Sequence, residues 1–270
     1  MLAATIIVFR EMLEMALVIG TLMAATSALP RSRHWIATGA ALGACGAAVV
    51  ALFMEQMESS FDGEGEFLFN AVVLALAAVL IGWTVIWMQR HGRELSTKMQ
   101  QVGAAVDDGS TPVTALMLIT LAAVMREGSE AVFFLFGAVQ ATAEDGWSVV
   151  AGALIGMILG GVVGWLVYRG LRHIPLQRIF ATVSLLLILM AAGMSSQAVW
   201  NLVVIERLPA LVDPLWDSSQ LLAQESILGE LLHALVGYEA QPSAMQMITF
   251  FIVLITLLLL MTRSRPVAAE

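Results

Sequence analysis

Seven long runs of apolar residues divide this chain and limit its fold more than any other feature. The runs are 1–29, 35–54, 67–88, 112–140, 147–168, 179–205 and 243–262. A helix needs about 20 apolar residues to cross the hydrocarbon core of a bilayer. The chain is 59% hydrophobic and 13% charged, whereas soluble domains have about 25% charged residues. The sequence therefore predicts an all-α polytopic membrane protein with seven transmembrane helices, and one membrane domain that takes up residues 1–270.

Charged residues interrupt only the first and the fourth of these runs. The sequence Arg-Glu-Met-Leu-Glu stands at 10–14, and Arg-Glu-Gly-Ser-Glu stands at 126–130. Residues three and four apart share a face of a helix, so each motif groups one arginine with two glutamates. Each charge at a helix centre costs about 2.5–3.5 kcal/mol, and six in contact with lipid would cost about 15–20 kcal/mol. We therefore expect all six to face the bundle interior and one another.

Three features of the first half recur in the second half at a nearly constant separation. They are the charged motif (Arg10 and Arg126, 116 apart), the start of a stripe of small residues (Gly39 and Gly152, 113 apart) and the start of an apolar run (Phe67 and Ile179, 112 apart). The chain therefore contains two copies of a three-helix unit, about 1–90 and about 111–205. Because three is odd, the second copy crosses the membrane in the opposite sense. This predicts an inverted 3+3 repeat plus one extra helix at about 243–262, a plan common among transporters.

The basic residues between the runs predict the orientation of the chain. Ten of the eleven outside the motifs fall on one side: Arg31, Arg33, Arg90, Arg93, Lys98, Arg169, Arg172, Arg178, Arg263 and Arg265. Lysine and arginine are enriched in cytoplasmic connections, so we expect the N-terminus outside and the C-terminus inside. Only Arg207 then lies outside. The acidic residues of the connections show the opposite bias, which either attracts cations to the outer face or is the default composition of outer loops.

The long outer connection, 206–242, has its own pattern. Its leucine and isoleucine residues recur at near-helical spacing between 221 and 235. This spacing predicts one or two short amphipathic helices that lie on the membrane surface or cap the bundle. Gly237 and Pro242 end the pattern before the seventh run.

The two motifs indicate a site for a hard cation. An inverted repeat would bring the first and fourth helices together as antiparallel neighbours. Carboxylate oxygens suit ferric iron, calcium, magnesium or manganese rather than soft metals. The candidate metal ligands are Glu11, Glu14, Glu127 and Glu130, and their candidate charge partners are Arg10 and Arg126. An inert salt-bridge network is the alternative, and the occurrence of the motif at two symmetric positions disfavours it.

Other kinds of chemistry have little support. The four histidines lie outside the interiors of the runs, and neither His-Glu-x-x-His nor Gly-x-Ser-x-Gly occurs. An intramembrane enzyme that uses acidic residues is therefore disfavoured, because no nucleophile or catalytic metal motif accompanies the carboxylates. We expect no permanently bound cofactor and no nucleic-acid partner.

The residues resemble those of a known family. Besides the paired motifs, the similarity covers Glu-Phe-Leu-Phe-Asn-Ala at 66–71, Trp-Met at 87–88, His-Gly-Arg-Glu at 91–94, Leu-Trp-Asp-Ser-Ser at 215–219 and Gly-Glu-Leu-Leu-His-Ala-Leu-Val-Gly-Tyr at 229–238. With these features the chain resembles the high-affinity, oxidase-dependent iron permeases of fungi and bacteria over nearly its whole length.

The resemblance implies import of iron across the plasma membrane, or the inner membrane of a bacterium. The motif glutamates would bind Fe(III) produced by an external oxidation step, with a ferroxidase or a periplasmic iron-handling protein as partner. Glu64 and Glu66 are candidates for an outer access site. Met12 stands where the family usually has glycine, which would put bulk beside the site. A permease for another cation, such as lead or manganese, and a membrane metal sensor that does not transport are the alternatives.

Overall fold

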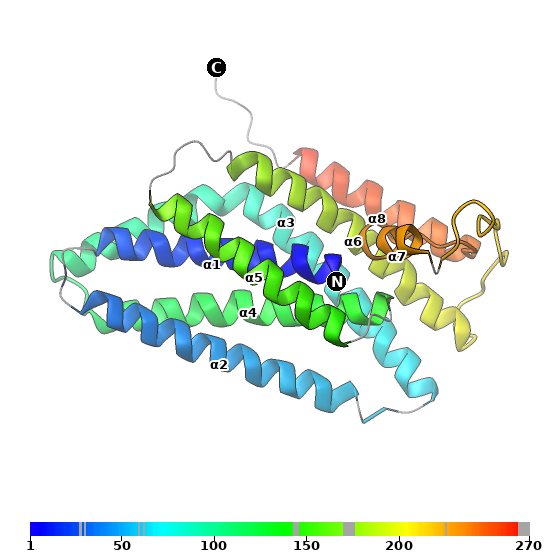
Figure 1. Cartoon of the computed structure of the whole chain (residues 1–270), viewed down its shortest axis with the longest axis horizontal. Coiled ribbons are helices and arrows are strands. Elements are labelled where there is room, and N and C mark those ends of the chain that lie inside the picture. Colours follow the sequence, from blue (N-terminus) through cyan, green and yellow to red (C-terminus); the bar gives the residue numbers. More distant parts are fainter. Residues whose placement is uncertain are drawn as a thin grey trace, which may run out of the picture.

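The computed structural model describes residues 1–26, 29, 31–58, 60–61, 63–142, 146–169, 176–224 and 226–263. In these ranges every regular element is a helix, which confirms the predicted all-α class (Figure 1). The helices are α1 (Leu2–Ala25), α2 (Ser32–Glu58), α3 (Glu64–Asp107), α4 (Thr114–Thr142), α5 (Gly146–Tyr168), α6 (Leu176–Val204), α7 (Ile227–Val236) and α8 (Ala244–Arg263). Arg172 and Arg265, on which the predicted orientation partly depends, lie outside the described residues.

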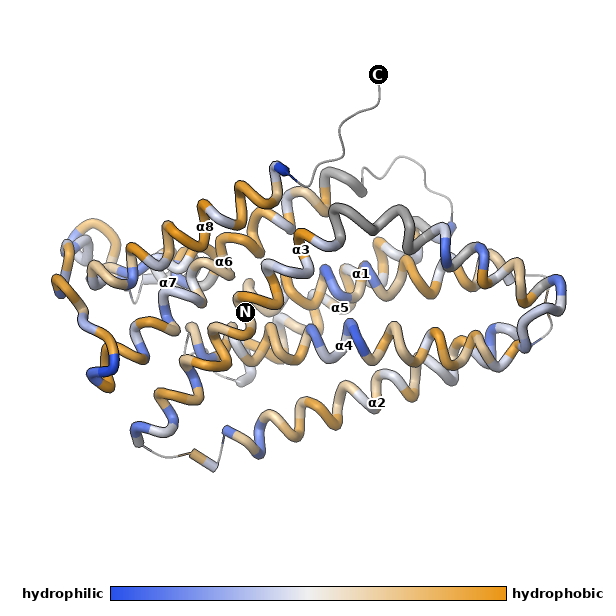
Figure 2. Tube along the Cα trace, turned by 180° about the vertical axis from the view of Figure 1, so that it is seen from behind, coloured by the Kyte–Doolittle hydropathy of each residue, from blue (hydrophilic) through white to orange (hydrophobic). Residues whose placement is uncertain are grey.

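In the described part of the chain, five helical segments are long and apolar enough to cross a membrane. They are Ser32–Glu58, Glu64–Trp87, Gly146–Leu166, Ile179–Val204 and Ala244–Arg263. The helices α1 and α4 also have membrane length, with 24 and 29 residues. Every window of 18 residues in either helix contains all three charges of its motif, and these charges set the two helices apart from the others. Figure 2 shows the hydrophilic residues as interruptions near the middle of both helices.

The helix α3 is longer than predicted. The apolar run ends near residue 88, but the helix continues to Asp107 and has 44 residues. At 1.5 Å per residue it would span about 66 Å, about twice the thickness of the hydrocarbon core. Its extension contributes Val102 and Val106 to a cluster with Leu22 of α1 and Leu116 of α4. The sequence analysis treated the residues after 88 as a connection, and this was wrong. Few apolar residues hold the extension in place, and so its sequence carries little helical pattern.

The two motif-bearing helices lie antiparallel at the centre of the bundle. Near one end of the bundle, Ile7 of α1 belongs to the same buried cluster as Phe134 of α4. Near the other end, Leu22 of α1 packs with Leu116 of α4. The helix α2 packs along α4, α5 packs along α1, and α3 packs against α6. This arrangement places both motifs at the middle of the bundle.

Glycines allow close contact between α2 and α4 and between α5 and α1, and the two sets of contacts involve equivalent positions of the repeat. A Cβ atom added to Gly43 of α2 would lie 2.8 Å from the Leu121 carbonyl oxygen of α4. One added to Gly156 of α5 would lie 2.5 Å from the Thr5 carbonyl oxygen of α1. The glycines are 113 residues apart and their partners are 116 apart, the separations at which the sequence features recur. Small residues of this kind let membrane helices approach closely.

We predict that Gly156→Ala destabilises the protein by about 1–3 kcal/mol, because the added methyl group would force α5 away from α1. Gly161 of the same helix is the matched control, because a Cβ atom there would meet nothing within 4 Å. Gly161→Ala should be neutral or stabilise the helix by up to about 1 kcal/mol. Thermal unfolding of both variants in detergent tests the contact. Equal melting temperatures would contradict it.

In the described residues of the long connection before α8, the predicted leucine pattern forms one helix, α7, which begins at Ile227 rather than at residue 221. Ser226 caps its start by accepting a hydrogen bond from the Gly229 amide, and Gly237 ends it in the left-handed conformation with φ 69°. A Cβ atom on Gly237 would lie 2.4 Å from the Cα atom of Gly193 on α6. The absence of side chains at both positions therefore lets the end of α7 dock on α6.

His233 attaches α7 to the end of α4. Its Nδ1 atom lies 2.7 Å from the Tyr238 carbonyl oxygen, and its Nε2 atom lies 2.8 Å from the Ala141 carbonyl oxygen. The two ring nitrogens thus contact the chain at both sides of the α7–α4 junction, and Nε2 of Gln224 also lies 2.9 Å from Nδ1. The Glu239 carboxylate lies 3.6 Å from Nδ1. Burial raises the pKa of Glu239, and the neighbouring His233 opposes that shift.

Candidate metal centre

The α1 motif forms a compact, buried group of charges. Nη1 of Arg10 lies 3.0 Å from Oε1 of Glu11, and Nη2 lies 2.9 Å from Oε1 of Glu14. The three side chains are at least 95% buried. One guanidinium thus holds two carboxylates of its own helix, at the spacing of a single turn. The surrounding apolar helices make such ion pairs necessary, because an unpaired charge in this environment is very costly.

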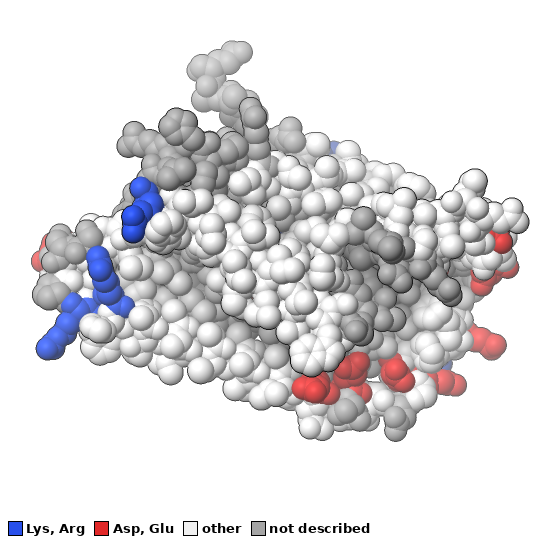
Figure 3. Space-filling model, in the orientation of Figure 1, with Lys and Arg blue, Asp and Glu red and all other residues white. Residues whose placement is uncertain are grey.

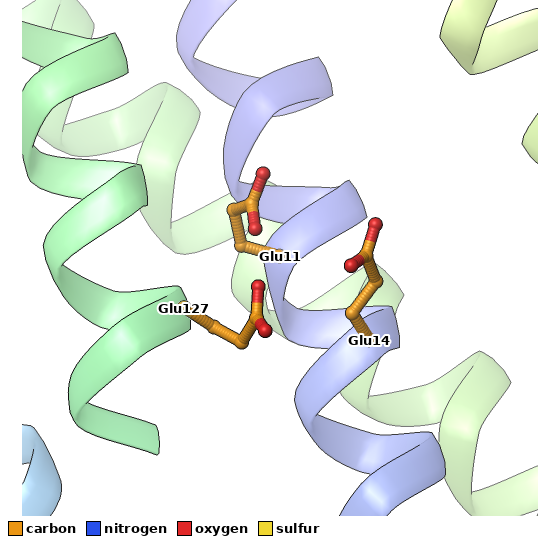
Figure 4. Close-up of side chains that lie close together, drawn as sticks. All are labelled: Glu11, Glu14 and Glu127. Atoms are coloured by element: carbon orange, nitrogen blue, oxygen red, sulfur yellow. The ribbon is translucent and has the colours of Figure 1, made fainter. Parts of the chain in front are cut away.

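Glu127 of α4 completes a cluster of three carboxylates. One oxygen from each of Glu11, Glu14 and Glu127 lies within 4.8 Å of the others. Figure 4 shows Glu127 reaching from α4 towards the two glutamates of α1. Hard cations such as calcium bind oxygen at about 2.3–2.6 Å, so an ion between these three oxygens could contact all of them. The predicted convergence of the two motifs therefore holds for three carboxylates.

Three buried oxygens of the cluster have no hydrogen-bond partner in the described part of the chain. They are Oε2 of Glu11, Oε1 of Glu14 and Oε2 of Glu127. Of these, Oε1 of Glu14 still lies at ion-pair distance from Arg10. Buried polar atoms nearly always have a partner, so each exception calls for an explanation. A cation bound between the carboxylates would supply the missing interaction and offset their mutual repulsion. The donor set is oxygen only, which suits a hard ion.

Glu130, the fourth predicted ligand, does not join the cluster. Its Oε1 atom accepts a hydrogen bond from Nε of Arg126 at 2.9 Å, and its Oε2 atom accepts one from the Thr84 hydroxyl of α3 at 3.1 Å. The Arg126 guanidinium lies 4.9 Å from the ring centre of Trp87, also on α3. Nε of Arg126 lies 3.8 Å from Oε1 of Glu127. Sequence reasoning gave no site role to Thr84 or to Trp87, although Trp87 is among the residues that carry the family resemblance, because a single hydroxyl or indole in an apolar run is common in any membrane helix.

Met12 occupies a helix–helix contact. A Cβ atom on Gly160 of α5 would lie 2.7 Å from the Cβ atom of Met12. In the other motif the roles are exchanged, because a Cβ atom on Gly128 would lie 2.7 Å from the Cβ atom of Ala47 on α2. Each contact therefore pairs one glycine with one larger residue. The sequence suggested bulk beside the carboxylates, but the Met12 side chain starts on the face of α1 that packs against α5.

The two candidate outer access residues are separate from the cluster. Glu64 and Glu66 lie in the first turn of α3 and are exposed. Glu64 forms a long ion pair of 3.9 Å with Arg207. Figure 3 shows acidic residues gathered at this end of the molecule and basic residues at the opposite end. Acidic side chains also favour the first turn of a helix, where the helix dipole is positive.

A buried carboxylate cluster between two helices of membrane length is a candidate site for a cation within the bilayer. The comparison with known families is specific: the sequence profile of the Iron permease FTR1 family matches residues 1–265, and the chain belongs to this family. The resemblance seen in the sequence is thereby confirmed. The members are permeases rather than enzymes, so the protein is a multi-pass membrane transporter, which in bacteria lies in the inner membrane.

Similar proteins carry names that agree with this family. The chain is 29% identical over 262 residues to "Ferrous iron permease EfeU" of Escherichia coli O6:H1, with 93% of this chain and 91% of the relative covered. It is 30% identical over 218 residues to the protein of the same name from Shigella flexneri, with 77% and 88% covered. No solved structure matches the chain significantly.

Proposed function

We propose that this protein imports iron through the carboxylate cluster of Glu11, Glu14 and Glu127, with Glu130 as a fourth ligand. The observation that carries the proposal is the convergence of three buried carboxylates from α1 and α4 within 4.8 Å. Arg10 and Arg126 act as charge partners that offset the repulsion between the carboxylates when no cation is bound. Iron is the transported substrate, and the site needs no resident cofactor. Membership in an iron permease family supports the choice of metal.

We also propose that the bundle is an inverted repeat with seven membrane spans, α1 to α6 and α8. The glycine contacts of the α2–α4 and α5–α1 pairs recur at the separations of the repeated sequence features, 113 and 116 residues, and this supports the repeat. The basic end seen in Figure 3 would face the cytoplasm, and the acidic end with Glu64 and Glu66 would face outside and attract cations. The antiparallel course of α1 and α4 is what such a repeat requires.

The imported iron is either Fe(III) or Fe(II). The resemblance to oxidase-dependent permeases favours Fe(III), delivered by an external ferroxidase or a periplasmic iron-handling protein. The names of the curated relatives favour ferrous iron. An oxygen-only site suits either ion better than a soft metal. Permeation of lead or manganese is the alternative for the substrate, and metal sensing without transport is the alternative for the function.

Uptake of radioactive metal into proteoliposomes tests the proposal. Iron should be offered as Fe(II) under anaerobic conditions, as a soluble Fe(III) chelate, and as Fe(II) with an added oxidant, beside manganese and lead. We expect iron to accumulate inside the vesicles, and a requirement for the oxidant would identify the Fe(III) route. Saturable iron binding without accumulation would indicate a sensor. Accumulation of manganese or lead in preference to iron would overturn the choice of substrate.

A further inference from the structure

The two motifs have the same sequence pattern but different surroundings. In α1, Arg10 is 2% exposed and contacts both carboxylates of its motif. In α4, Arg126 is 44% exposed, and it lies 2.9 Å from Glu130 but 3.8 Å from Glu127. The first motif therefore contributes both of its glutamates to the cluster, whereas the second contributes one. This asymmetry needs a cause outside the motifs.

The helix α3 supplies contacts that only the second motif receives. Thr84 and Trp87 are three residues apart and so share a face of α3. The Thr84 hydroxyl donates to Oε2 of Glu130, and the Trp87 ring lies against the Arg126 guanidinium. In the described part of the chain, no hydroxyl group donates a hydrogen bond to Glu11 or Glu14. Both oxygens of Glu130 are thus engaged, while Glu11 and Glu127 each keep a buried oxygen without a partner.

We propose that Thr84 and Trp87 position Glu130 and Arg126 outside the cluster, so that Glu130 enters the site only while a cation is bound. This inference rests on the proposed function of the carboxylate cluster. A cation among Glu11, Glu14 and Glu127 attracts the fourth carboxylate and draws it from Thr84. Its return to Thr84 weakens the hold on the cation and promotes release. Thr84 acts through Glu130 and is a positioning residue, not a ligand.

The hydrogen bond between Thr84 and Glu130 should lower the affinity of the cluster for a cation. A hydrogen bond to a charged acceptor that must break when the cation binds reduces the affinity for that cation. Thr84→Val removes the hydroxyl and keeps the shape of the side chain. It should lower the Kd for Fe(II) about tenfold, and it should slow transport turnover by a similar factor because release becomes harder. Thr84→Ser, which keeps the hydroxyl, should restore both values.

Thr120 provides a matched control. It is 0% exposed, compared with 2% for Thr84, and its hydroxyl has no hydrogen-bond partner among the described residues. Thr120→Val therefore makes the same chemical change in an equally buried place, and it should leave both the Kd and the turnover as they are. A second control is Glu130→Gln. In that background Thr84→Val should no longer tighten binding, because the carboxylate that Thr84 restrains is absent.

The test uses the full-length protein in detergent for anaerobic Fe(II) binding and in proteoliposomes for uptake. Tighter binding and slower turnover in Thr84→Val alone support the inference. A Kd equal to or weaker than that of the wild type would overturn it, as would the same tightening in the Glu130→Gln background. If the wild type binds Fe(II) but does not accumulate it, the transport proposal fails, while the binding measurements still decide the role of Thr84.

Discussion

Iron uptake should fall more than about 100-fold when Glu127 is replaced by glutamine. Glu127 is the ligand by which α4 reaches the two carboxylates of α1. Changing a residue that merely orients a metal ligand costs about 10–100-fold in affinity or activity, so loss of a ligand should cost more. With all three carboxylates ionised, they and Arg10 carry a net charge of −2, and the substitution leaves −1. The measurement is uptake of radioactive iron into proteoliposomes, normalised to the amount of folded protein.

The same variant should remain folded. Oε2 of Glu127 has no partner in the described part of the chain, and its charge repels the carboxylates of α1. Glu127→Gln should therefore melt at the wild-type temperature or higher. Glu55→Gln, at an exposed glutamate near the end of α2, is the control for the loss of a carboxylate elsewhere and should transport normally. Wild-type uptake by Glu127→Gln would show that the Glu127 carboxylate of α4 is not needed in the site.

Replacing Arg10 by methionine should destabilise the protein by about 3–5 kcal/mol, because it leaves buried carboxylates without their counter-charge. Arg126→Met is the matched comparison. Arg126 is nearly half exposed, so its loss should cost closer to the about 1 kcal/mol of an exposed ion pair. Unfolding in detergent by heat or denaturant measures the difference between the two variants.

A rescue distinguishes lost pairing from lost packing. If unpaired charge causes the instability, then adding Glu11→Gln and Glu14→Gln to Arg10→Met should recover most of the stability, since a neutral network of similar volume replaces the charged one. Failure of this triple variant to recover would show that the packing of the guanidinium, and not its charge, stabilises α1.

Much of the fold could be predicted because the bilayer limits the choices. Each apolar run of about 20 residues must become a helix, and a helix of the structure covers most of each of the seven runs. The extension of α3 escaped prediction because residues 89–101 are largely polar. Only its packing on the ends of α1 and α4 shows why it stays helical. The apolar pattern of the sequence was enough to predict the helices within the seven apolar runs, but not the extension of α3 beyond its run.

The site was predictable to the level of the motif but not beyond it. Charges at 10–14 and 126–130 had to face one another, because lipid excludes them. The displacement of Glu130 from the cluster depends on Thr84, which is close only after α3 has packed beside α4. The accommodation of Met12 depends likewise on Gly160 of α5. Both details arise from contacts between helices, which a single sequence does not specify.

X-ray absorption of iron bound to the purified protein tests the central claim most directly. The carboxylate cluster predicts a first shell made only of oxygen atoms, and it predicts that Glu127→Gln lowers the amount of iron bound without introducing any other kind of ligand. A first shell that contains sulfur or imidazole nitrogen would contradict the account. So would an unchanged oxygen shell at full occupancy in the Glu127→Gln protein, because the iron would then be bound elsewhere.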